Sequence, residues 1–403
     1  MPSNVSLPRA LAMPTALGLV AWALFGPNRD VVRWADFPVG GPARVNGTVL
    51  QGPGWARTDL FFECVSSGEL CHGWYFQPAL SSAFEPSADG KVPLVIMASG
   101  LGAQIDFGMD NYAKAFAQAG LAAFLFDYRG FGSSGGSPRN LAHPGRHLAD
   151  LRAALALAAS EAGLAPGAGL AADAWGKADA SRVALWGTSL AGGHVLALAG
   201  ELGRRQSGDA GLLLGQAGPM MIRAVVAQSP HLDGRANRAK NASPPPAGRG
   251  LRGVLRLFRA ALQDVARAAL GLEPAYVPIV GPLGSTSLMP LGPLELGLYF
   301  AKHPRSDKGG GWRNMAPARI ALLMGGYSPM DALGEVQTPV LLVAAQEDEL
   351  CPLSLVEAAH EKLRDSELVV LPACSHFGLY FDPAFDPAVE AMVGFLKREL
   401  ALV

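Results

Sequence analysis

Short apolar runs alternate with longer segments of helical periodicity along most of this 403-residue chain. Val92–Ala98 is a continuous apolar run, and a helical pattern through Tyr112 and Phe116 leads to a second run at 121–126. Such runs are typical of strands buried on both faces, and strands that alternate with helices form mainly parallel sheets. The pattern predicts an α/β fold with helices on both faces of a mostly parallel central sheet.

The alternation continues to the end of the chain with one long interruption. Further strands are predicted at 182–186, 223–228, 339–345 and 368–371, and further helices at 147–160, from 190, at 353–363 and at 387–400. Upstream, β-like runs at 58–64 and 71–77 flank a Ser-Ser-Gly turn, as in an antiparallel hairpin. We therefore expect a core at 57–230 and 339–403, an insertion at 231–338 and an N-terminal extension at 1–56.

Ser189 lies in the sequence LWGTSLAGGH, between the strand at 182–186 and the helix that follows. A serine at the tip of a tight strand-to-helix turn needs small neighbours, because the backbones crowd together there. Gly187 and the Ala-Gly-Gly after Leu190 meet this need, although Ala191 departs from G-x-S-x-G. The motif indicates a nucleophile, whereas a plain turn serine remains the alternative.

An acidic residue and a histidine each follow a later strand. Asp348 lies just past the strand at 339–345, and His376 lies just past the next one. The carboxyl ends of parallel strands meet at one edge of a sheet, so both should lie beside Ser189. A serine hydroxyl needs a base to take its proton, and that base needs a carboxylate to orient it. Glu347 is the alternative acid.

The order serine, acid, histidine resembles that of the α/β-hydrolase superfamily. The resemblance is to its serine-aminopeptidase-like and dienelactone-hydrolase-like esterase branch, and it spans roughly 58–400. It rests on VIMASGLGAQ, FDYRGFGSSGG, GTSLAGGH, AQSPHLDG, QEDELCP, SHFGLY and, in the insertion, WRNMAPARIALL.

The resemblance implies a role for each matching residue. Ser189 would be the nucleophile, His376 the general base and Asp348 its orienting acid. The backbone N–H groups of Leu101 and Leu190 would form the oxyanion hole. The implied activity is hydrolysis of carboxylic esters or thioesters of small molecules through an acyl-enzyme, without a cofactor or metal.

The loops after the strands at 92–98 and 121–126 differ in what the resemblance implies for them. Many relatives have His-Gly where this chain has Ser99-Gly100, which leaves a backbone oxyanion hole intact but removes any bracing role of that histidine. The residues 127–130 that follow the strand at 121–126 resemble a structural turn and are not expected to be catalytic.

The insertion at 231–338 occupies the position in the chain where this superfamily has its cap domain, so we expect it to cover the pocket. We expect a helix at 249–271, then a Pro- and Gly-rich stretch that could form an extended hairpin, and a helix near 313–325. An apolar loop at 276–300 would line the pocket.

The first of these helices carries two kinds of side chain on different sides. Apolar residues point to one side and arginines to others: Val254, Leu255, Phe258, Leu262 and Val265, with Arg252, Arg256, Arg259 and Arg267. Three interpretations stay open: a solvated outer face, contact with an anionic membrane, or binding of an acidic substrate.

Charge and cysteine content exclude other classes. The net charge of −1 gives no overall attraction to nucleic acid. No spacing among the four cysteines suits a zinc site. An oxidising compartment would permit Cys64–Cys71 and Cys351–Cys374 disulfides, and buried thiols are the alternative.

Residues 10–26 form an uncharged apolar segment after Arg9. Its length fits a signal peptide, a membrane anchor or an organelle presequence, and a helix packed on the core is the alternative. The protein is therefore expected to be secreted, membrane-associated through 10–26 or organellar, and otherwise cytoplasmic.

Other functions fit the same fold. An aminopeptidase-type peptidase would need a group in the insertion to bind a free N-terminus, for which Glu295 and Glu335 are candidates. An acyltransferase would differ by excluding water, and a non-catalytic binding protein would usually lack one of the three residues. A dehalogenase-type reaction would need a carboxylate in place of Ser189.

Overall fold

The computed structural model describes residues 49–64, 68–79, 90–159, 178–206, 222–236, 250–302 and 312–401. The apolar segment 10–26 lies outside these residues. Among the described helices, none is long and apolar enough to span a bilayer.

A nine-stranded sheet forms the centre of the described chain, with strand order β1-β2-β3-β5-β4-β6-β7-β12-β13. Its strands are β1 Val49–Gly52, β2 Trp55–Glu63, β3 Leu70–Pro78, β4 Val92–Ala98, β5 Ala122–Phe126, β6 Ala178–Thr188, β7 Ile222–Gln228, β12 Val340–Ala345 and β13 Ser366–Leu371. The strands from β5 to β13 pair in parallel, whereas β1, β2 and β3 are antiparallel. The α/β fold class is therefore confirmed, and the sheet begins before the boundary expected at residue 57.

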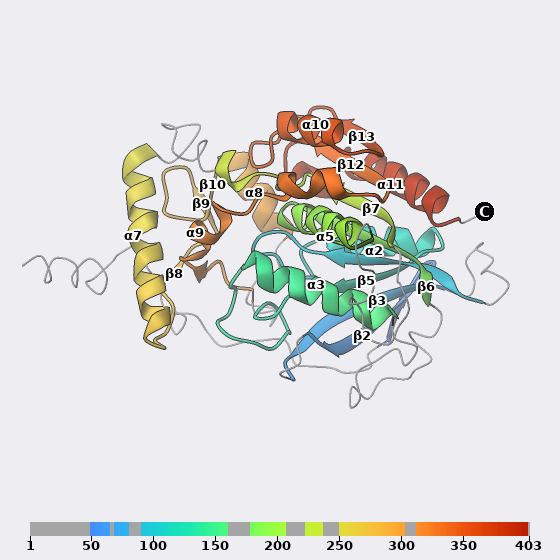
Figure 1. The fold of residues 1–403 in the computed structure, drawn as a ribbon, viewed down its shortest axis with the longest axis horizontal. Helices are drawn as coiled ribbons and strands as arrows, with labels where there is room; N and C mark the ends of the chain where they lie inside the picture. The colour runs from blue at the N-terminus through green and yellow to red at the C-terminus, as the bar shows by residue number, and fades with distance from the viewer. Residues whose placement is uncertain are drawn as a thin grey trace, which may run out of the picture.

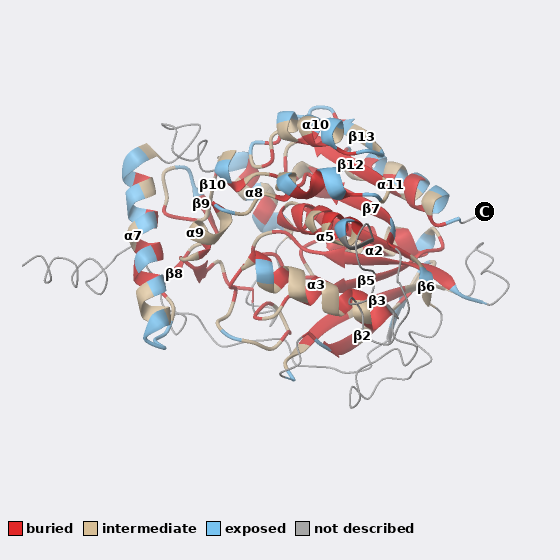
Figure 2. Cartoon of the chain, in the orientation of Figure 1, coloured by how far each residue is buried: buried red, intermediate tan, exposed pale blue. Residues whose placement is uncertain are grey.

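Helices cover both faces of this sheet, as the continuous apolar strands require (Figure 1). They are α2 Met109–Gln118, α3 Pro144–Ala159, α5 Leu190–Gln206, α10 Leu353–Lys362 and α11 Phe385–Glu399. Helix α3 packs with α5 in front of the sheet in Figure 1, and α2 packs with α11. Every residue of β4, β5 and β12 is buried, so the apolar runs form the core seen in Figure 2.

The chain between β7 and β12 contains two short sheets and several helices. They are α7 Gly250–Ala269, β8 Tyr276–Val277, β9 Val280–Pro282, β10 Met289–Leu291, α8 Pro293–Lys302, β11 Ala316–Pro317, α9 Ile320–Met324 and the 3-10 helix η3 Pro329–Glu335. The extended hairpin expected in the Pro- and Gly-rich part of the insertion is wrong, because β9 and β10 pair in parallel. The helix expected near 313–325 is limited to α9.

Helix α8 lies in the stretch 276–300, where the sequence predicts an apolar loop and no helix. Its start carries a usable signal, since Pro293 is the first helical residue and Glu295 lies in the first turn. Glycines and prolines surround this start and interrupt the helical periodicity. The helix matters here because it carries Glu295 and Tyr299 into buried positions.

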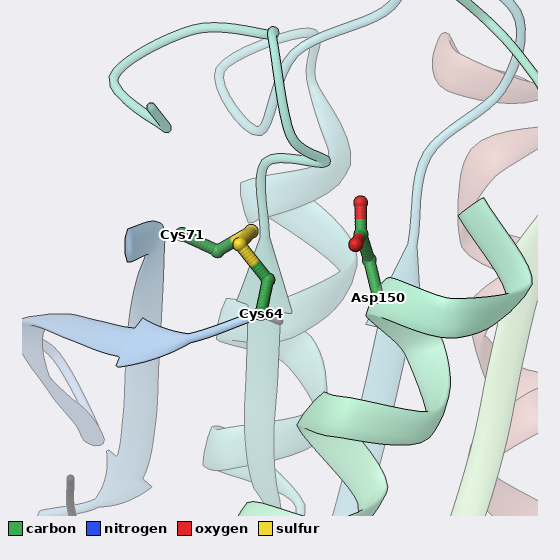
Figure 3. A group of neighbouring side chains, drawn as sticks. All are labelled: Cys64, Cys71 and Asp150. Carbon is green, nitrogen blue, oxygen red and sulfur yellow. A yellow bond between two sulfur atoms is a disulfide. The ribbon is translucent and has the colours of Figure 1, made fainter. Parts of the chain in front are cut away.

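The four cysteines divide into one disulfide and two thiols. Cys64 and Cys71 are joined across the ends of β2 and β3 (Figure 3). Cys351 and Cys374 are both buried and free. Only the first of the two permitted bridges therefore forms, and the second pair follows the alternative of buried thiols.

Candidate active site

Ser189 occupies the turn between β6 and α5 in a left-handed conformation, with φ of 55°. Its N–H donates to the Gln228 carbonyl at 2.8 Å, and its own carbonyl accepts the His231 N–H at 2.8 Å. A non-glycine residue persists at such an angle only when its surroundings hold it there. These bonds to the end of β7 and the residues after it keep the Ser189 side chain clear of the sheet and half exposed.

The small residues around Ser189 are needed by the backbone. A Cβ atom on Gly187 would lie 2.2 Å from the Ala191 carbonyl oxygen, and one on Gly193 would lie 2.2 Å from that of His231. Ala191, the departure from G-x-S-x-G, is fully buried with its methyl group accommodated. The turn is therefore formed as the motif predicts.

His376 and Asp348 meet at the same edge of the sheet. The ring Nδ1 of His376 donates to Asp348 Oδ2 at 2.7 Å. The other carboxylate oxygen, Oδ1, accepts the N–H groups of Leu350 and Cys351 at 2.8 and 2.6 Å. Because both of its oxygens accept hydrogen bonds, the Asp348 carboxylate is held in one orientation. Its bond to Nδ1 fixes the His376 ring, so the other ring nitrogen, Nε2, points away from Asp348.

The electrostatics of this pair favour a charged imidazole. Burial of His376 disfavours its charged form, but the Asp348 carboxylate outweighs burial and holds the pKa of His376 well above its ordinary value. Glu347, the alternative acid, is exposed, and its N–H donates to the Cys374 carbonyl. The geometry therefore selects Asp348 as the partner of His376.

Cys351 is a neighbour that the sequence analysis missed. Burial raises the pKa of its thiol, and hydrogen bonds to His376 and Ser189 act in the opposite direction. Within the described chain no direct hydrogen bond joins Ser189 to His376, and the Cys351 sulfur lies within 4.8 Å of a His376 ring nitrogen. The sequence signal for Cys351 is its place three residues after Asp348 and directly before Pro352.

The loop after β4 lies against Ser189. A Cβ atom on Gly100 would lie 3.1 Å from Ser189 Cβ, which places the next residue, Leu101, beside the turn. The N–H groups of Leu101 and Leu190 make no hydrogen bond within the described residues. Both are thus available to a ligand atom next to Ser189.

The insertion contacts this same loop. Trp312 Nε1 donates to the Gly102 carbonyl at 2.9 Å. Gly102 has φ of +73°, and a Cβ atom there would lie 2.7 Å from Ile279 Cγ2. These contacts place Trp312 and Ile279 of the insertion against the loop that carries Leu101.

Known proteins share both the sequence and this architecture. AidA of Acinetobacter baumannii strain MDR-ZJ06, a quorum-quenching protein, is 31% identical over 316 residues, which is 78% of this chain and 89% of AidA. The crystal structure of the α/β-hydrolase GrgF from Penicillium sp. sh18 superimposes with a TM-score of 0.61 at 21% identity, over 86% of this chain and 99% of GrgF. The chain belongs to the α/β-hydrolase superfamily. The expected resemblance to the α/β-hydrolase superfamily is therefore confirmed.

A third relative is more specific in name. The thiohydrolase ApmlB of Arthrinium phaeospermum is 26% identical over 270 residues, which is 66% of this chain and 74% of ApmlB. No protein-family model matches the chain.

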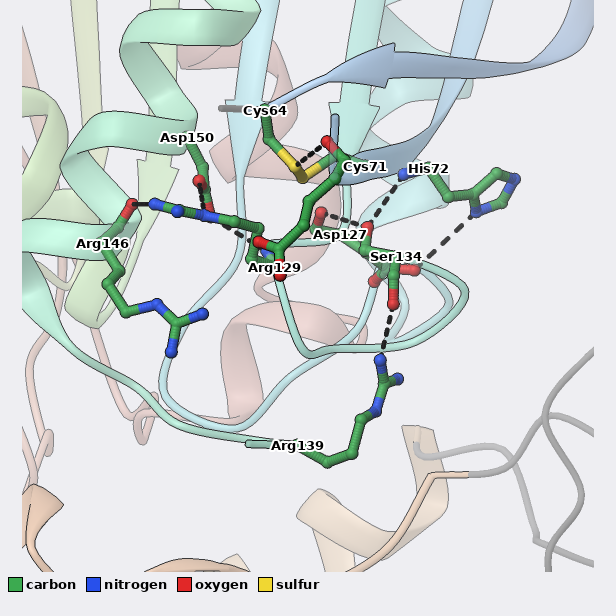
Figure 4. Close-up of a disulfide and its surroundings, with 10 residues drawn as sticks. Cys64, Cys71, His72, Asp127, Arg129, Ser134, Arg139, Arg146 and Asp150 are labelled. Carbon is green, nitrogen blue, oxygen red and sulfur yellow. Dashed lines mark hydrogen bonds and ion pairs between the residues drawn. A yellow bond between two sulfur atoms is a disulfide. The ribbon is translucent and has the colours of Figure 1, made fainter. Parts of the chain in front are cut away.

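Asp127 of this α/β-hydrolase braces the loop that carries Leu101. Its carboxylate accepts the N–H groups of Ile105 and Ser133 at 3.0 and 3.2 Å. Its carbonyl accepts the Ser134 hydroxyl at 2.6 Å (Figure 4). Burial opposes charge on His72, but the flanking carboxylates, Asp127 first, raise its pKa to about 9. The contacts are those of a structural turn, as the sequence predicts for 127–130.

Two groups of potential metal ligands occur in the described part of the hydrolase. Cys64, Cys71 and Asp150 lie close together, but the disulfide removes both thiolates (Figure 3). The ligand atoms of Asp348, Cys351 and His376 lie within 4.8 Å of one another. The sequence spacing does not predict this second group, because Asp348 and Cys351 follow one strand and His376 follows another.

The two glutamates considered for binding an N-terminus lie in different surroundings. Glu295 is buried, and its Oε2 accepts the N–H of Phe377 at 3.3 Å. Phe377 directly follows His376 in the sequence. Glu335 is exposed at the end of η3, where its carbonyl packs on Gly203 of α5. Only Glu295 is therefore placed near the His376 loop.

Proposed function

We propose that this α/β-hydrolase is a serine hydrolase that cleaves carboxylic ester or thioester bonds through an acyl-enzyme on Ser189. The observation that carries the proposal is the oriented His376–Asp348 pair, 2.7 Å apart, at the sheet edge where Ser189 is held at φ of 55°. A nucleophile, a base and a group that orients the base are the parts that acyl transfer needs.

The chemistry follows from these positions. Ser189 Oγ turns about its side-chain torsion to His376 Nε2, which takes its proton as the hydroxyl attacks the acyl carbon. The N–H groups of Leu101 and Leu190 stabilise the negative charge on the carbonyl oxygen. His376 then protonates the leaving group and later activates the water that releases the acid. Asp348 holds Nδ1 protonated and stabilises the imidazolium throughout.

Aromatic side chains beside His376 favour an apolar acyl group. The His376 and Phe377 rings lie 4.9 Å apart, and Phe377 and Phe107 both lie 5.0 Å from Tyr299 of α8. Aromatic side chains this close to the base favour an apolar group beside it over a charged one. The name of the thiohydrolase relative supports thioesters, and that of AidA adds quorum-sensing signal molecules to the substrates that deserve assay.

The proposal is tested with p-nitrophenyl esters and matching thioesters of increasing acyl length, together with a fluorophosphonate probe. We expect turnover that peaks at one acyl length, and a single probe adduct that peptide mass spectrometry locates on Ser189. Labelling of another residue, or no turnover of either bond type, would contradict the proposal. Turnover only with a second acyl acceptor in place of water would identify an acyltransferase.

A further inference from the structure

Helix α7 exposes large apolar side chains along one side, which we call the exposed stripe. Its members are Leu251, Leu255, Phe258, Leu262 and Val265. They recur at alternating intervals of four and three residues, so they form one continuous line on a helix. Leu251 is 72% exposed and Leu255 56%, and the helix stands at one end of the molecule (Figures 1 and 2).

The face that α7 packs on the protein contains one large apolar residue, Leu257, together with small and polar residues. Its buried members are Gly253, Leu257, Ala260, Ala261, Gln263 and Asp264. Asp264 accepts the N–H groups of Ala275 and Arg319 at 3.0 and 2.9 Å. The usual arrangement is therefore largely reversed, because α7 buries Leu257 but leaves five other large apolar residues in solvent.

Positive charge flanks the exposed stripe. Arg252 and Arg256 are exposed, and Arg256 donates only to a backbone carbonyl, that of Gly284. The one carboxylate on α7, Asp264, is buried and paired with Arg319. The charge that α7 presents outward is therefore positive along its whole length.

Other exposed apolar residues lie in the same part of the chain. Among the described residues, the exposed large hydrophobic side chains outside 251–300 are only Leu50 and Val370. Leu294 and Phe300 on α8 add to those of α7. Exposed apolar side chains that gather in one part of a soluble protein, rather than lying scattered singly, mark interaction sites.

We propose that α7 docks the protein on an anionic lipid surface, with the exposed stripe in the acyl boundary and Arg252 and Arg256 at the headgroups. A basic, amphipathic helix with leucine and phenylalanine on its apolar side is suited to this position. A second copy of the chain fits less well, because its α7 would bring further arginines and no exposed helical carboxylate to pair with them. The proposal is independent of the nucleophile assignment.

The test is flotation of the full chain with vesicles of phosphatidylcholine, with and without phosphatidylglycerol. We expect binding to the anionic vesicles that falls with added salt. The Leu255→Ser/Phe258→Ser and Arg252→Glu/Arg256→Glu variants should each bind at least about tenfold more weakly. Circular dichroism and thermal unfolding should stay unchanged in both variants, which shows that they fold.

Matched changes elsewhere serve as controls. Leu50→Ser/Val370→Ser removes the exposed apolar residues of the sheet, and Arg364→Glu/Lys397→Glu reverses two exposed charges far from α7. Both should bind vesicles as the wild type does. Undiminished binding of the α7 variants would overturn the proposal and assign binding to another segment. A wild-type dimer in sedimentation equilibrium that the stripe variant dissociates, without vesicle binding, would assign the stripe to a second copy.

Discussion

Replacement of Ser189 by alanine should lower kcat for the best p-nitrophenyl ester by a factor on the order of 10⁶, the loss typical when a triad nucleophile is removed. The alanine keeps the Cβ atom, so the strain at φ of 55° and the contact with Gly100 stay as they are. Circular dichroism and thermal unfolding should therefore match the wild type. Steady-state hydrolysis of the same ester measures the loss.

Ser229 offers a matched control, because it is also a serine at positive φ after a strand. Ser229→Ala should hydrolyse the ester at close to the wild-type rate. Residual turnover of Ser189→Ala should be tested in a Ser189→Ala/Cys351→Ala double variant, since the Cys351 thiol contacts the same base. Wild-type turnover by Ser189→Ala would refute the nucleophile assignment.

Replacement of Asp348 by asparagine should lower kcat about 10⁴-fold, because an amide favours the wrong tautomer of His376. The pH profile gives a second readout. Asp348 raises the pKa of His376, so its neutral, base-competent form prevails only above the ordinary value of 6.5. The acid limb of kcat/KM should thus lie above pH 6.5 in the wild type and move to lower pH in Asp348→Asn.

Glu347→Gln is the control for this change. Glu347 is exposed and its side chain has no described contact with His376, so the variant should keep the wild-type rate and pH profile. A large loss confined to Glu347→Gln would transfer the acid role to Glu347. An acid limb that does not move in Asp348→Asn would show that the carboxylate does not control His376.

Most of the sheet could be predicted from local pattern. Val92–Ala98 is β4 itself, and the runs at 223–228 and 339–345 each match their strand to within one residue. These strands are buried on both faces, so their apolar content is continuous and visible in the sequence. The insertion was harder, because short strands such as β9 and helices such as α8 are stabilised by contacts with distant segments rather than by local pattern.

The sequence by itself determined the order of serine, acid and histidine, and the small residues that let the turn at Ser189 close. Both depend on neighbours along the chain. Only the tertiary structure decided which carboxylate meets His376, that the Cys351 sulfur lies beside this pair, and that Cys351 and Cys374 stay unbridged. It also decided that α7 turns its large apolar side outward. Such contacts depend on which distant segments pack together in the fold. Hydrophobic periodicity shows that a helix has an apolar face, but it does not show whether that face is buried.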